Sequence, residues 1–230
     1  MAIAPFLAMT GTEIQCSGEL PQKIAWLGCH FSQSGKGLSN IPRWLPEGSL
    51  LILEDSSPMD GHDPRLVCQQ LEEIVTQWEC AGVLLDFQRE HPEGEKEMAA
   101  AIVSALPCPA AVSARYARDL DCPVFLPPIS VSTPIEEALA PWKGRECWLE
   151  LALDGECITV TQTGATVSDL VRIPGEGFPE ESLHCHYSLE LGENQAKWTL
   201  WRTREDIAAL LETAESLGIT TAVGLWQELG

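Results

Sequence analysis

The most informative run in the sequence is Gly82–Gln88, which reads GVLLDFQ. Its apolar start and polar end predict a parallel strand that is buried on both faces and finishes in functional side chains. Because side chains alternate along a strand, Asp86 and Gln88 share one side, and Glu90 follows with the same parity. Barrels and open sheets hold their sites at the carboxyl ends of parallel strands, so this column predicts site residues.

Short apolar runs alternate with amphipathic stretches through the first half of the chain, which is typical of βα units around a parallel sheet. Strands are predicted at 24–31, 49–55, 82–88, 110–113 and 123–126, and helices at about 64–80, 93–106 and 133–140. The run Ile3–Met9 is a candidate for one further strand. Asp63 is the predicted N-cap of the helix that begins at Pro64, and Thr133 that of the helix beginning at Pro134.

The pattern changes after Trp142. Asp154-Gly155 predicts a hairpin between 147–153 and 156–162, and a second hairpin joins 183–190 to 195–201. A final αβ unit follows, with Thr203 capping its helix. We therefore predict a single domain over residues 1–230 with an α/β fold. It is a compact or degenerate (β/α)8 TIM-like barrel with an antiparallel hairpin insert, about 146–201, before the last αβ unit.

The composition narrows the class of partner. There are 14 Lys and Arg against 34 Asp and Glu, a net charge of −20, which argues against nucleic acid and membrane surfaces. The nine cysteines show no CxxC spacing, so buried reduced thiols in a cytoplasmic protein are expected rather than a zinc site or a disulfide framework. His184 and His186 fall in a predicted hairpin rather than a barrel strand, and we predict no metal and no cofactor.

A family resemblance rests on three segments. Residues 81–88 resemble the fourth-strand motif DGxDxDxE of the chitinase-like glycoside hydrolases of family 18, Leu50–Asp55 sits where that family has its third strand, and 207–229 resemble its last helix and closing strand. The resemblance implies a TIM barrel with Trp226 at its floor. It also implies an oligosaccharide ligand.

The chain departs from the motif at the acid. In the family the motif's Glu protonates the leaving oxygen while the substrate's acetamido group acts as the nucleophile. Here that position is Gln88, and the earlier acidic positions fall on Ala81 and Leu84, so only Asp86 remains. A carboxamide cannot donate the proton. The main hypothesis is therefore a carbohydrate-binding barrel with impaired catalysis.

Two alternatives stay open. One is an active glycoside hydrolase in which Glu90 donates the proton and Asp86 is its electrostatic partner. The other is a non-enzymatic interaction or scaffold protein, since a fold does not fix a function. The sugar and the oligomeric state are left open. The residues predicted to contact an oligosaccharide or other small-molecule ligand are Gln88, Asp55, Tyr187, Trp201, Trp226 and Glu228.

Overall fold

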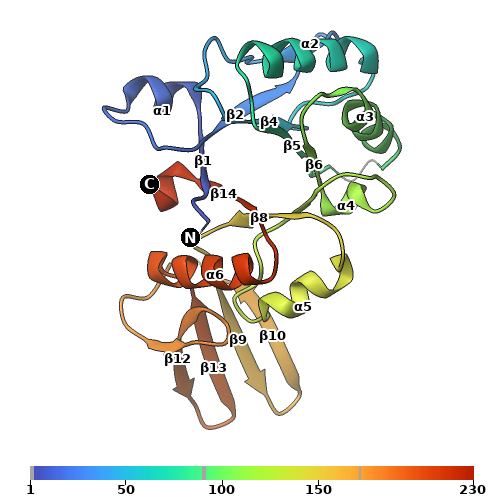
Figure 1. The fold of residues 1–230 in the computed structure, drawn as a ribbon. Helices are drawn as coiled ribbons and strands as arrows, with labels where there is room; N and C mark the ends of the chain where they lie inside the picture. The colour runs from blue at the N-terminus through green and yellow to red at the C-terminus, as the bar shows by residue number, and fades with distance from the viewer. Residues whose placement is uncertain (1–2, 90–91, 171) are drawn as a thin grey trace.

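A closed barrel of parallel strands forms the body of the molecule (Figure 1). The computed structural model describes residues 3–89, 92–170 and 172–230. The barrel strands are β1 Phe6–Met9, β2 Ile24–Phe31, β4 Leu50–Glu54, β5 Gly82–Asp86, β6 Ala110–Ser113, β7 Val124–Leu126, β8 Cys147–Leu151 and β14 Thr221–Leu225. Because β1 pairs with both β2 and β14, the ring is complete, which confirms the predicted barrel and gives the Ile3–Met9 run its strand.

The helical layer around the barrel is uneven. Its helices are α1 Gly11–Cys16, α2 Pro64–Gln77, α3 Pro92–Ala105, α4 Ala114–Ala117, α5 Ile135–Leu139, α6 Arg204–Ser216 and α7 Trp226–Leu229, with a 3-10 turn at Ala140–Trp142. The fully described connection from β2 to β4 holds only β3, Leu38–Ser39, which pairs antiparallel with β2. The barrel is therefore degenerate, as predicted.

Two predicted helix caps have opposite outcomes. Asp63 caps α2 by accepting a hydrogen bond from the Arg65 N–H, which confirms the first. The second is wrong, because α5 begins at Ile135 and has no side-chain cap. The backbone N–H of Thr133 donates to the Ser130 carbonyl instead, so Thr133 belongs to a turn before the helix.

Alternate residues of the barrel strands fill its interior. An inner apolar cluster joins Leu50, Ile52, Leu84, Phe125 and Trp148, and a larger outer cluster packs the strands against the helices. Trp148 is only 3% exposed. A side chain on β5 at position 82 would lie 2.9 Å from this indole and 2.8 Å from the Pro109 carbonyl, so only glycine fits there.

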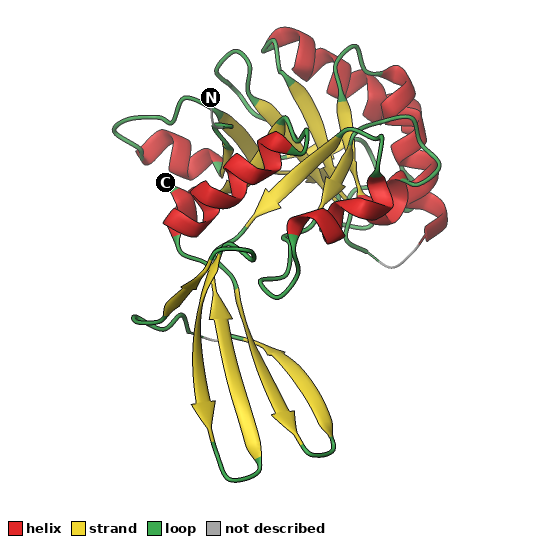
Figure 2. Cartoon of the chain, turned by 60° about the horizontal axis from the view of Figure 1, so that its bottom comes forward, coloured by secondary structure: helices red, strands yellow, loops and turns green. Residues whose placement is uncertain are grey.

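An antiparallel sheet is inserted between β8 and α6 (Figure 2). Its strands are β9 Gly155–Thr161, β10 Gly164–Asp169, β11 Phe178–Glu180, β12 Cys185–Leu191 and β13 Gln195–Trp201, in the order β10-β9-β13-β12-β11. The predicted hairpin of β12 with β13 is confirmed.

The predicted hairpin around Asp154-Gly155 is wrong. β8 pairs in parallel with β7 and β14, and β9 pairs instead with β10 and β13. The Asp154 carbonyl accepts the Arg202 N–H, so this dipeptide is the point where the chain leaves the barrel. The insert therefore starts at β9, later than predicted. Across the described residues, no helix has the length and apolar character needed to cross a bilayer.

Candidate functional site: the barrel mouth

Three carboxylates enter the barrel at the carboxyl ends of its strands. They are Glu54 of β4, Asp86 of β5 and Glu150 of β8, each two residues beyond an inward-facing core residue, Ile52, Leu84 and Trp148 respectively. The two-residue period turns the acids toward the same interior. Register also places Glu54 directly beside Asp86 across the β4–β5 pair. The mouth of the barrel is therefore lined by an acidic layer.

The pKa values of the three carboxyl groups in this layer are all raised. Burial, followed by the charges of Asp86 and Glu228, raises the pKa of Glu150 to about 7. Burial and the neighbouring Asp86 also raise the pKa of Glu54, and burial with the Asp55 charge raises the pKa of Asp86. Each carboxylate is thus affected by its neighbours as well as by desolvation, which indicates that they share one poorly hydrated space.

Gln88 sits at the rim of this layer. Its side-chain nitrogen Nε2 donates to Oδ1 of Asp86 at 2.5 Å, and its side chain is otherwise exposed. The backbone N–H groups of Gln88 and Arg89 donate to the two oxygens of Asp55 at 3.0 and 2.8 Å. Asp55 is 3% exposed, so in this structure its carboxylate holds the loop that carries Gln88.

His30 joins the mouth from β2, beside Glu54. An irregularity in the strand between Trp26 and Cys29 shifts its register and turns His30 toward the acids. The ring atom Nδ1 lies 3.1 Å from the Phe31 carbonyl, which can only accept, so Nδ1 carries a proton. The His30 charge acts to lower the pKa of Glu54, against the larger effect of burial.

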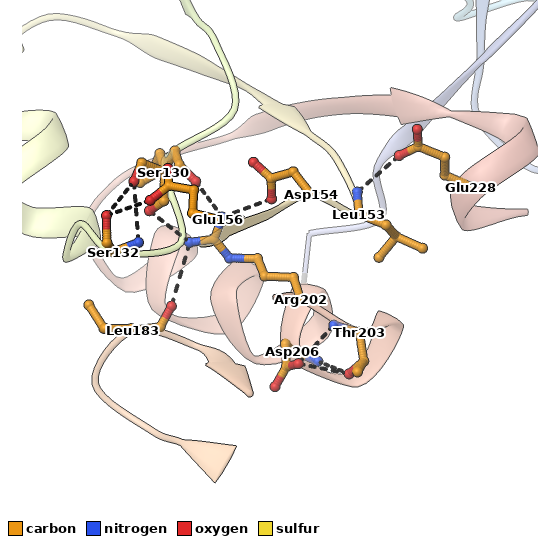
Figure 3. Close-up of polar contacts among 11 residues, drawn as sticks. Ser130, Ser132, Leu153, Asp154, Glu156, Leu183, Arg202, Thr203, Asp206 and Glu228 are labelled. Carbon is orange, nitrogen blue, oxygen red and sulfur yellow. Dashed lines mark hydrogen bonds and ion pairs between the residues drawn. The ribbon is translucent and has the colours of Figure 1, made fainter. Parts of the chain in front are cut away.

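The two predicted residues at the end of the chain have different positions. Glu228 reaches the rim, where its Oε2 accepts the Leu153 N–H at 2.9 Å (Figure 3). Trp226 does not form the barrel floor. The strand β14 ends at Leu225, so Trp226 begins α7, and its side chain packs against the outer cluster. Inside the barrel, the indole in the inner cluster is that of Trp148.

The structure does not bring the other predicted residues to the acidic layer. Tyr187 and Trp201 lie in the inserted sheet, where Tyr187 contacts Phe178 and Trp198. Trp201 is 2% exposed, so its ring is used for packing rather than presented to a ligand. Glu90 lies outside the described residues, and its role stays a prediction. Within the described ranges, no cluster of three or more His, Cys, Asp or Glu side chains is suited to a metal ion.

A buried arginine fixes the insert beside the mouth (Figure 3). Arg202, which follows β13, is 2% exposed and donates to the carbonyls of Ile129, Ser130 and Leu183. Its Nη1 lies 3.6 Å from Oδ1 of Asp154. Burial lowers the pKa of Arg202 and raises that of Asp154, as expected for charges removed from water.

The fold is shared with a known class of protein structures. The chain has the TIM-barrel fold of the chitinases of glycoside hydrolase family 18 and of SleL-like glycosylases. The Bacillus cereus spore cortex-lytic enzyme SleL aligns with 99% of this chain and 71% of its own length, at a TM-score of 0.58 and 11% identity.

Two chitinases show the same likeness. The Cycas revoluta family 18 chitinase in complex with (GlcNAc)3 aligns with 98% of this chain and 94% of its own, at a TM-score of 0.57 and 10% identity. The Chromobacterium violaceum chitinase aligns with 96% of this chain and 93% of its own length, at a TM-score of 0.56 and 9% identity. At these identities the likeness concerns the fold alone. No family model and no curated protein match the sequence.

Replacing Glu150 with Gln is expected to stabilise the protein at alkaline pH. In the folded state the pKa of Glu150 is about 7, against its usual 4.5. Protonated Glu150 therefore contributes a stability that is fully present below pH 4.5 and is lost as pH rises through about 7. A glutamine has no such loss. Denaturant unfolding should give Glu150→Gln an advantage larger at pH 8 than at pH 5 by roughly 2 kcal/mol, after allowance for screening.

The exposed Glu137 on α5 provides the control for this measurement. Glu137→Gln should follow the parent protein at both pH values. An equal effect of Glu150→Gln at pH 5 and pH 8 would show that Glu150 is not held protonated by the barrel.

Proposed function

We propose that the chain binds an oligosaccharide at the barrel mouth and does not carry out substrate-assisted hydrolysis. The observation that carries the proposal is the Gln88 amide, which binds Asp86 at the point where the family resemblance places the proton donor. An amide in this position has no proton to give to a leaving oxygen. It retains a donor and an acceptor for sugar hydroxyls.

The rest of the mouth supports the same proposal. Glu54, Asp86 and Glu150 supply carboxylate oxygens, and His30 supplies a ring nitrogen, so groups that bind hydroxyls converge from four strands. The Cycas revoluta chitinase that shares the fold is solved with an N-acetylglucosamine oligomer. N-acetylglucosamine oligomers are therefore the first ligands to test.

The test combines isothermal titration calorimetry with product analysis on the same samples. The parent protein should bind N-acetylglucosamine oligomers without releasing shorter products. Asp86→Ala should weaken binding at least tenfold, because it removes both an acceptor and the partner of Gln88. Asp121→Ala, an exposed aspartate before β7 at the opposite end of the barrel, is the matched control and should bind like the parent. Equal binding by both variants would contradict the proposal.

A second candidate function is hydrolysis by a different acid. The observation that favours it is the pKa of Glu150, which burial raises to about 7, the range of a working general acid. In this reaction the Glu150 carboxyl gives its proton to the glycosidic oxygen as the C–O bond breaks. Water adds its hydroxyl to the anomeric carbon and passes its proton to Asp86. One reaction therefore leaves Glu150 without its proton and Asp86 with one more.

Product analysis separates the two functions and their acids. Products from the parent protein that disappear in Glu150→Gln would establish the second candidate and contradict the first. Loss of products in Glu90→Gln would instead make Glu90 the donor. Absence of both binding and products would favour a scaffold role.

A further inference from the structure

The inserted sheet has one apolar face and one polar face. Register aligns its outer rows across β12, β13, β9 and β10. On one face these rows are Leu189–Trp198–Ile158–Val167 and Leu191–Ala196–Val160–Ala165. On the other they are Ser188–Thr199–Cys157–Ser168 and Glu190–Lys197–Thr159–Thr166. This alternation is typical of a sheet that buries one face against another layer.

No such layer covers the two outer rows among the described residues. Figure 2 shows the sheet extending away from the barrel with no helix packed on either side. Near the barrel, Leu200 packs with Val131 from the loop after β7, and Tyr187 and Ile158 pack against that cluster. Six apolar side chains on this face have high exposed fractions: Leu191 77%, Phe178 67%, Val167 63%, Val160 41%, Leu189 40% and Trp198 37%, with Phe178 of β11 paired to Tyr187 in the row nearest the barrel.

The size of this face suits a protein contact. At roughly 150–250 Å² for a large side chain, the exposed fractions correspond to about 600 Å² of apolar surface. That is at the upper limit of the apolar patches that monomers leave open, about 300–600 Å². A standard interface covers about 800 Å² on each partner, so the patch with a polar rim is large enough for a stable dimer.

We infer that the apolar face is the contact surface between two copies of this chain, packed sheet on sheet about a twofold axis. A twofold axis brings the same surface patch of both copies together, so a patch rich in acids would meet another acidic patch and be repelled. The chain carries a net charge of −20, yet the two outer rows of this face hold no charged residue. The opposite face carries Glu190 and Lys197. Two such sheets would form a sandwich with a shared core.

The test is sedimentation equilibrium of the full chain from about 1 to about 100 μM, across the range of a micromolar dissociation constant. The parent should form a dimer. Val167→Lys on the apolar face of β10 should weaken association at least tenfold, while Ser168→Lys on the adjacent polar position should leave it unchanged. Both variants add the same positive charge to an acidic chain, so net charge cannot explain a difference. Val167 is 63% exposed, which leaves folding intact.

Emission of Trp198 gives a second measurement, because a dimer should bury its indole and shift the spectrum to the blue. A monomer throughout the concentration range would overturn the inference, and so would a dimer that tolerates Val167→Lys. A monomer whose Trp198 emission responds to N-acetylglucosamine oligomers would assign the face to a glycan and would also overturn it. None of these results depends on binding at the barrel mouth.

Discussion

Replacing Gln88 with Glu is expected to give the chain hydrolytic activity toward N-acetylglucosamine oligomers. The new carboxyl would lie beside Asp86, at the rim of the layer in which Glu54 and Glu150 already have raised pKa values. The negative charge of Asp86 would raise the pKa of this carboxyl above its ordinary value, in the direction that a general acid requires. Because a positioned acid contributes about 10²–10⁴-fold, product release should rise at least 100-fold above the parent.

Two control variants distinguish the effect of the new carboxyl group from the effect of a changed side-chain shape. Gln88→Ala removes the amide without supplying a proton and should remain inactive. Asp86→Asn added to Gln88→Glu should abolish most of the gain, since Asp86 is the group that contacts position 88. A Gln88→Glu protein that binds the oligomers but releases no product would contradict this prediction, because a carboxyl at position 88 would then not be sufficient for hydrolysis.

The largest expected loss of stability follows from Arg202→Met. Methionine keeps much of the length of the side chain but leaves Asp154 half-buried without its cation and three carbonyls without a donor. Removing one partner of a buried ion pair costs about 3–5 kcal/mol. For a chain of this size the melting temperature should fall by roughly 10 °C in a thermal scan.

Two further variants test that explanation. Adding Asp154→Asn to Arg202→Met should recover part of the loss, because no unpaired charge remains. Lys197→Met breaks the exposed 4.0 Å pair with Glu190 on the insert and should change stability by less than about 0.5 kcal/mol. If Arg202→Met melted like Lys197→Met, the arginine would not be the anchor of the insert.

Sequence patterns predicted the barrel because its strands have local signatures. In Gly82–Gln88, every residue before Asp86 is apolar, on both faces of the strand. This pattern is typical of a strand that is covered on both sides. The strand β8 has the same character, with Cys147, Trp148 and Leu149 all buried. In the sequence, the Asp154-Gly155 turn signal outweighs that character. Because of this error, Glu150 was assigned to a hairpin rather than to the barrel and was not predicted as a site residue.

The remaining site errors have physical reasons too. Glu54 could have been found, because it shares the inward parity of Ile52. His30 could not, since an irregularity inside β2 changes which face it occupies. Trp226 was placed from a family position, but β14 ends at Leu225 and the next residue begins a helix. A turn of the backbone at a strand end is not visible in residue types alone.

The pairing of β1 with β14 determines when the barrel can close during synthesis. β1 leaves the ribosome before the other barrel strands, yet it finds its second neighbour only after β14 has been made. Until then β1 and β8 each keep one unpaired edge, which can bind the strands of other chains. Nascent chains halted before Thr221 should therefore aggregate more readily than chains that include β14, and chaperones would act mainly in that interval.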